Sequence, residues 1–137
     1  MSTTDLAIFD ETIHKTNIWV KEIGQTPDCD RHRSYQALRA VLHCLRDRLI
    51  VDEAAYLGDQ LPMLVRGIYY EAWRPSGKRE KIRSCEEFLY PIAAKLAQAP
   101  IKPEAAVRAV FQGLKNHIAP GEVLHVVDEL PQGFARC

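Results

Sequence analysis

The sequence has no excess of charge of either sign. Lys plus Arg and Asp plus Glu both number 18, so the formal net charge is zero. A neutral chain has no overall field that draws it to nucleic acid or to acidic lipid. No window approaches the ~18 apolar residues that a membrane span needs. The first residues, MSTTDLAIFDET, also have neither the basic segment nor the apolar core of a secretory signal. These absences argue against a membrane protein and against a DNA reader.

The cysteines show no pattern of a metal site or a disulfide framework. The four of them form no CxxC pair and have no regular spacing: Cys29, Cys44, Cys85 and Cys137. Without a signal peptide, reduced thiols and a cytoplasmic location are expected. Cys29 and His32, with Asp28 and Asp30, are metal-ligand types, but a structural zinc site normally needs four ligands, commonly in two close pairs. No second pair is present, so we predict neither a metal nor a cofactor.

What the sequence does contain is an internal repeat. Residues 37–66 align with residues 106–135 at an offset of 69, without a gap. Most of the other pairs are conservative replacements, and the offset extends to Trp19 with Phe88 and Ile23 with Ile92. A self-match of this kind fixes the architecture before any propensity argument. Nine positions are identical in the two copies: Ala37/Ala106, Arg39/Arg108, Ala40/Ala109, Val41/Val110, Leu45/Leu114, Glu53/Glu122, Asp59/Asp128, Leu61/Leu130 and Pro62/Pro131.

Apolar periodicity makes each copy helical. Leu38, Val41, Leu42, Leu45 and Leu49 follow the spacing of one buried helix face within a helix from Asp30 to about Arg48. A further helix opens at Pro103, and one that starts at Pro120 is assigned through the repeat, because its valines alone would suit a strand. Asp52 is predicted to cap a short third helix, and Gly58 within it to allow close helix approach. A first helix begins near Asp5, with one buried face predicted at Phe9, Ile13, Thr16, Val20 and Ile23.

We therefore predict an all-α fold: two tandem three-helix repeats packed as one pseudo-twofold helical bundle, with a short bridging apolar helix. The chain is one domain, 1–137, with repeat copies at about 5–67 and 80–136, linked by 68–79. Each copy alone would leave an apolar face open, so the two should fold together. Pro91 should kink its helix or delay the helix start.

Three segments carry a family resemblance: LRAVLHCLRDRL (38–49), VDEAAYLGDQLPMLVRGIYYEAW (51–73) and AVRAVFQGLKNHIAPGEV (106–123). With the amphipathic segments before each copy, they resemble the bacterial domain of unknown function 2267 family over nearly the whole chain. The resemblance implies a small, all-helical bacterial protein with no established activity and an association with stress-response genes. It implies no catalytic residue.

The candidate binding segment follows the first copy, where the repeat has no counterpart. Tyr69, Tyr70, Trp73 and Arg74 are of the residue types enriched at binding hot spots. They could form an exposed anchor for a protein partner or a second subunit, including a homodimer. Alternatively, Tyr69 and Trp73, four residues apart, fill the space between the two halves.

Other candidates have structural explanations. Glu53 and Glu122 lie in the first turns of their helices, where carboxylates complement the helix dipole. Arg39 is expected to pair with Asp59, and Arg108 with Asp128. The basic groups 31–33 and 78–83 lack an identifiable recognition helix. A Ser or Cys nucleophile has no local signature that places a His and an acid beside it.

The sequence thus favours a non-catalytic protein-interaction module. The alternative is a small-molecule-binding protein or enzyme with a pocket between the two repeats, and a weak nucleic-acid binder is the third possibility.

Overall fold

A computed structural model describes residues 4–25, 30–75, 85–96 and 101–128. These residues form seven α-helices and no strand, which confirms the all-α prediction for the described part of the chain. In chain order the helices are α1 (Ala7–Gln25), α2 (Arg31–Arg48), α3 (Val51–Asp59), α4 (Met63–Tyr70), α5 (Cys85–Lys95), α6 (Pro103–His117) and α7 (Pro120–Asp128).

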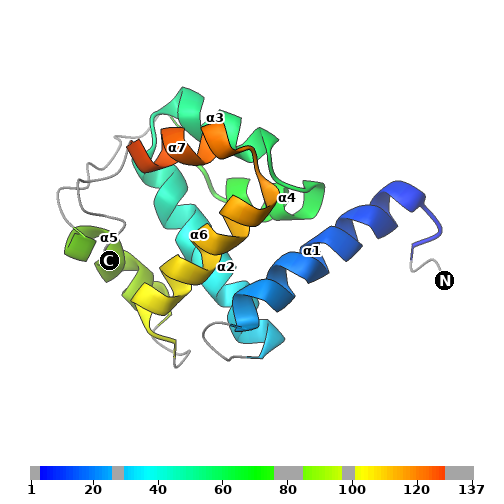
Figure 1. The fold of residues 1–137 in the computed structure, drawn as a ribbon, viewed down its shortest axis with the longest axis horizontal. Coiled ribbons are helices and arrows are strands. Elements are labelled where there is room, and N and C mark those ends of the chain that lie inside the picture. The colour runs from blue at the N-terminus through cyan, green and yellow to red at the C-terminus, as the bar shows by residue number, and fades with distance from the viewer. Residues whose placement is uncertain (1–3, 26–29, 76–84, 97–100, 129–137) are drawn as a thin grey trace.

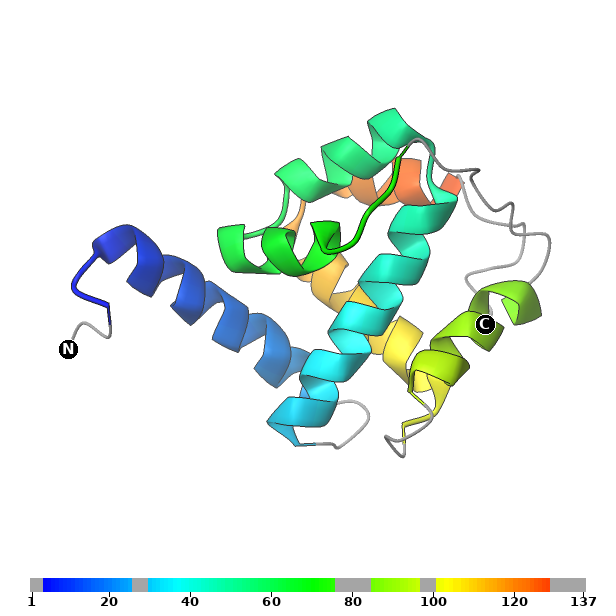
Figure 2. The same ribbon diagram turned by 180° about the vertical axis from the view of Figure 1, so that it is seen from behind.

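Helix α2 lies at the centre of the fold. It contacts α1, α4, α5 and α6, and Figures 1 and 2 show it crossing α6 in the middle of the molecule. The Asp30 side chain caps its first turn by accepting a hydrogen bond from the Arg33 amide at 2.8 Å. The five predicted core residues of this helix are all buried, at Leu38, Val41, Leu42, Leu45 and Leu49.

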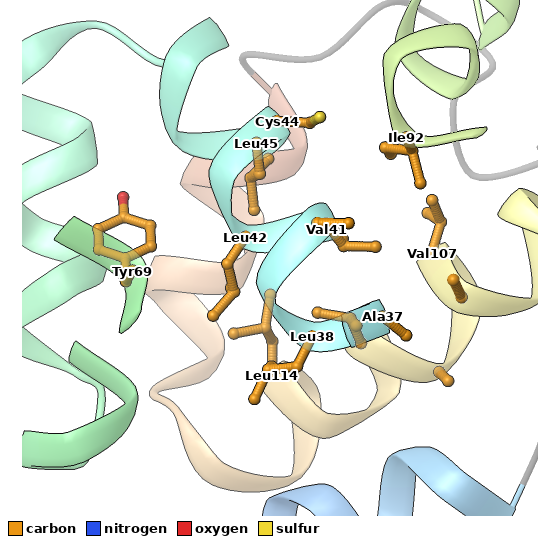
Figure 3. Packing of buried hydrophobic residues seen from close by; sticks show 14 of the residues in the cluster. Ala37, Leu38, Val41, Leu42, Cys44, Leu45, Tyr69, Ile92, Val107 and Leu114 are labelled. Carbon is orange, nitrogen blue, oxygen red and sulfur yellow. The ribbon is translucent and has the colours of Figure 1, made fainter. Parts of the chain in front are cut away.

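The core extends to both sides of α2. Figure 3 shows Tyr69 of α4 on one side of the helix and Ile92 with Val107 on the other. Burying an aliphatic or aromatic side chain of this kind contributes ~1.5–3 kcal/mol. Because α2 has apolar neighbours all around it, it organises both halves of the chain. The remaining helices, α3 and α7, contact each other at one end of the molecule (Figure 1).

Helix α7 confirms the assignment that rested on the repeat. Residues 120–128 are helical despite three valines, and Val126 is buried against the core. Two other predictions need correction. Asp52 does not cap α3, which begins one residue earlier at Val51 with Ile50 at its N-cap. Of the two effects predicted for Pro91, the delayed helix start is wrong, because α5 begins at Cys85 and contains the proline; the kink stays a prediction.

Helix α1 has two unlike halves. Its inner half, from Thr16 to Ile23, supplies buried residues to the core. Its outer half extends away from the other helices, as Figures 1 and 2 show, and Phe9 there is 45% exposed. The predicted buried face is therefore wrong at its outer end. Periodicity identifies the apolar face of a helix, but it does not show how far along that face the neighbouring helices pack.

Candidate interaction surface

The segment after α4 begins with a tight turn. The Trp73 amide donates to the Tyr70 carbonyl at 3.1 Å. Glu71 has φ −56° and ψ 125°, and Ala72 has φ 60°. These angles are those of a type II turn with Ala72 at the position that favours glycine. An L-residue with positive φ is strained, so the surroundings must hold this turn in place.

Three side chains of α2 hold the turn. His43 donates its Nε2 proton to the Ile68 carbonyl at 2.6 Å, and burial lowers the pKa of its ring. Arg46, only 4% exposed, donates from Nη1 to the carbonyls of Tyr69 at 2.7 Å and Glu71 at 2.8 Å. The end of a helix leaves its last carbonyls without partners, and cations are favoured there. We call Arg39, His43 and Arg46 the α2 clamp.

Arg39 completes the α2 clamp at its solvent side. Its guanidinium binds the Glu71 carboxylate, with 3.1 Å between Nε and Oε1. This hydrogen bond raises the pKa of Arg39 and lowers the pKa of Glu71. The predicted Arg39–Asp59 pair is therefore wrong, because Glu71, beyond the repeat, takes the arginine instead. For the second predicted pair, the Asp128 side chain lies outside the described residues.

The structure separates the four residues of the predicted anchor. Tyr69 is completely buried, and its hydroxyl donates to the Ala54 carbonyl at 2.7 Å. Burial strongly raises the pKa of this phenol. Tyr70 and Trp73 are half-buried and stack with ring centroids 5.3 Å apart. Arg74 is exposed. Tyr69 therefore has the core-filling role of the alternative prediction, and any binding surface here consists of the other three residues.

A second surface was not predicted. Five large apolar side chains just before α1, on its outer half and at the start of α4 are more than 40% exposed; we call them the α1–α4 surface: Leu6, Ile8, Phe9, Met63 and Leu64. The two helices meet here, since the Leu64 amide donates to Thr12 Oγ1 at 2.9 Å. Contiguous apolar groups on a protein surface commonly mark an interaction site.

A groove with a volume of about 470 Å³ runs beside this surface. One wall is α1, the other is the α3–α4 connection with Arg66, and His117 of α6 lies at its inner end. Its charged groups have partners within the chain. Lys15 pairs with Glu11 at 2.8 Å, and His117 pairs with Glu22 at 2.7 Å and stacks on Trp19. The lining residues are Ile8, Glu11, Thr12, Lys15, Ile18, Trp19, Gln60, Leu61, Pro62, Met63, Arg66 and His117.

Glu53 and Glu122 meet where α3 contacts α7. Their Oε1 atoms are both buried. Burial, a hydrogen bond to Glu53 and the charge of Glu53 together raise the pKa of Glu122 to about 7. The pair therefore holds a proton at pH values where separate glutamates have lost theirs. The sequence analysis explained each glutamate by the dipole of its own helix and did not predict that the two meet. The signal for this contact was that Glu53 and Glu122 are identical residues at equivalent positions of the repeat.

The remaining candidates are not assembled into a site. No three His, Cys, Asp or Glu side chains of the described residues gather in a way that could hold a metal ion. Asp28, Cys29 and the basic group 78–83 lie outside those residues. Arg31 binds Asn17, and Arg33 lies 3.8 Å from Asp30. From α1 to α7, no described helix has both the length and the low polarity that crossing a lipid bilayer requires.

The described part of the chain is thus an all-α protein with an apolar surface and a clamped aromatic turn. It belongs to the DUF2267 family of uncharacterized conserved proteins, whose family model matches residues 16–137. This confirms the resemblance seen in the three sequence segments. A comparison with curated proteins gives no match.

Proposed function

We propose that this protein is a non-catalytic protein-interaction module of the bacterial cytoplasm, associated with the stress response. The observation that carries the proposal is the α1–α4 surface. It joins exposed apolar side chains from two helices beside an open groove. Its Ile8 and Phe9 take no part in the core, so their exposure is free to serve binding. Exposed aromatic and aliphatic side chains of this kind are typical anchors of protein interfaces.

The groove supports a protein partner better than a small molecule. Arg66 donates from Nε to the Gly58 carbonyl at 3.1 Å and from Nη2 to the Leu61 carbonyl at 3.0 Å. With Lys15 and His117 also paired, the charged groups of the groove are engaged by the chain itself. Small-molecule sites instead direct a few polar groups at the ligand. A small-molecule-binding protein or enzyme is the second hypothesis for the function.

The same proposal includes the repeat symmetry. We infer that two copies of one three-helix unit pack about a pseudo-twofold axis. Such an axis requires equivalent helices to meet, and α2 contacts α6 while α3 contacts α7. It also requires equivalent residues to meet at the axis, as Glu53 and Glu122 do.

Site-specific photo-crosslinking in cells tests the interaction function. A photoreactive phenylalanine analogue at position 9 probes the α1–α4 surface, and one at position 74 probes the clamped turn. Tyr90 of α5, 79% exposed, provides the control position. We expect a discrete protein adduct from position 9 and none from position 90. Equal background at both positions would overturn the assignment of the α1–α4 surface.

A further inference from the structure

We infer that the α1–α4 surface binds a second copy of this chain, with the two α1 helices antiparallel across a twofold axis. The inference rests on the proposed interaction function and names its partner. The argument depends on one face of α1, on the groove beside it and on the order of charges along it.

Four residues form a stripe along one face of α1, from its outer half into its inner half: Ile8, Glu11, Lys15 and Ile18. Their steps of three, four and three residues place them within an arc of about 80° on the helix. All four line the groove. Glu11 and Lys15 have side chains 64% and 54% exposed, and Ile8 is 56% exposed. A helix that lies in the groove would therefore contact this stripe along its length of about 15 Å.

The order of the stripe is self-complementary in one orientation. If two α1 helices run antiparallel with the twofold axis at the level of residue 13, whose own side chain lies on the opposite side of the helix, Ile8 lies opposite Ile18 of the second copy. Glu11, which pairs with Lys15 of its own helix at 2.8 Å, then also lies opposite Lys15 of the second copy, and the twofold axis forms each contact twice. A parallel pair would place Glu11 on Glu11 and Lys15 on Lys15, which repel. The charges thus favour antiparallel pairing and disfavour parallel pairing.

The opposite wall of the groove suits the same occupant. Leu61, Pro62 and Met63 face the stripe from the α3–α4 connection, and Met63 is 44% exposed. The second copy's α1 would cover this wall while its own groove covers the first copy's α1. One symmetric contact would therefore cover Ile8 and Met63 of both copies, whereas Leu6, Phe9 and Leu64 do not line the groove.

Charge reversal with rescue tests the inference. Sedimentation velocity of the full chain should show a dimer for the wild type. Glu11→Lys and Lys15→Glu should each weaken the dimer about tenfold or more, because each places like charges opposite one another. An equimolar mixture of these two variants should form a heterodimer, and the double swap Glu11→Lys/Lys15→Glu should restore the homodimer. Glu86→Lys on exposed α5 is the matched control and should leave the dimer unchanged.

The outcomes separate this inference from the proposed function. A wild type that stays monomeric overturns the second copy as partner, and so does a dimer that both reversals leave intact. In either case a crosslink from position 9 to a different protein would keep the interaction function. Failure of both the dimer and the crosslink would end both proposals. Circular dichroism of each variant checks that α1 remains helical.

Discussion

At the scale of single residues, Gly58 and Tyr70 are matched by shape. Gly58 lies in the last turn of α3, one residue before the helix ends at Asp59, and glycine within a helix costs up to about 1 kcal/mol relative to alanine. A Cβ atom at this position would collide with the hydroxyl end of the Tyr70 ring. That ring also stacks on Trp73, so it cannot move without losing a contact. The prediction that Gly58 permits a close approach is therefore confirmed, with a side chain of α4 as the neighbour.

We predict that the sign of the Gly58→Ala effect depends on Tyr70. In the wild type the substitution should destabilise the fold by about 1–2 kcal/mol, because the ring is displaced. In a Tyr70→Leu background it should stabilise by about 0.5–1 kcal/mol, since the helix preference of alanine remains and the collision does not. Urea unfolding measures both values.

Gly67→Ala is the matched control. Gly67 lies within α4 and has nothing within 4 Å of a built Cβ atom. Its substitution should stabilise by about 0.5–1 kcal/mol in both backgrounds. If Gly58→Ala had the same effect with and without Tyr70, the shape match would have no energetic importance.

At the scale of elements, the α2 clamp fixes how α4 ends. It bonds to main-chain carbonyls through His43 and Arg46, and to a carboxylate through Arg39. The two kinds of contact contribute differently to the stability of the fold. Arg46 is buried and donates to the buried Tyr69 carbonyl and the part-buried Glu71 carbonyl, whereas the Arg39–Glu71 pair is solvent-exposed on both sides. Exposed ion pairs contribute ~0–1 kcal/mol.

We predict that Arg46→Ala destabilises the protein by about 2–4 kcal/mol, because it leaves buried carbonyls without donors and removes a buried side chain. Arg39 also contacts Glu71, but Arg39→Ala should lower the free energy of unfolding by less than about 1 kcal/mol. Thermal unfolding gives the stability, and Trp73 fluorescence reports whether the turn loosens. Equal losses for the two variants would show that the ion pair, and not the carbonyl bonding, holds the turn.

Most elements could be predicted from the sequence, and the exceptions have physical causes. Apolar spacing located α2 and α6, and the repeat assigned α7 correctly where valine propensity suggested a strand. The α2 clamp was missed because it joins side chains to carbonyls 23–25 residues away, which leaves no residue-type signal at the acceptor. Its one trace is that Arg39, His43 and Arg46 share a helix face.

At the scale of the whole molecule, the Glu53–Glu122 pair links the two halves of the chain to pH. The pKa of Glu122 is raised to about 7 in the fold, against ~4.3 for a free glutamate. Between these values the native chain holds a proton that the unfolded chain has released. The contribution to stability is therefore complete below about pH 4.3 and is lost as pH rises through about 7. Tyr69 of α4 lies close enough to feel the same charge.

We predict that Glu122→Gln removes this pH dependence. The variant should be about 1–2 kcal/mol more stable than the wild type at about pH 8, less than the full pKa difference would give because solvent screens this partly exposed pair, and nearly equal to it at about pH 4.5. His43 acts in the opposite sense, because its lowered pKa costs stability as pH falls below about 6.5, but it is common to both proteins and cancels in the difference. Denaturant unfolding across this pH range measures the difference.

The exposed Glu104→Gln on α6 is the control and should give a difference that is small at every pH. A Glu122→Gln effect of the same size at every pH would contradict a shared proton.

The candidate site was harder to predict than the fold. The types of the residues identified the aromatic turn as a candidate site. Only the structure shows that Tyr69 is buried in the core and that Arg74 is exposed. The α1–α4 surface was missed because its residues continue the same apolar period as the buried part of α1. The apolar period does not distinguish an α1 side chain that packs against other helices from one that lies beyond them. Which side chains are covered depends on the placement of α3 and α4.

The two halves of α1 have a consequence for how this protein can evolve. The family model begins at residue 16, and Thr16 is also the first buried residue of the helix. The inner half is thus constrained by folding, while the outer half is mostly exposed and meets the rest of the chain at α4, through the bond between Thr12 Oγ1 and the Leu64 amide. Under the proposed function, substitutions of the exposed residues in that outer half would change the choice of partner and leave the buried core of the fold intact.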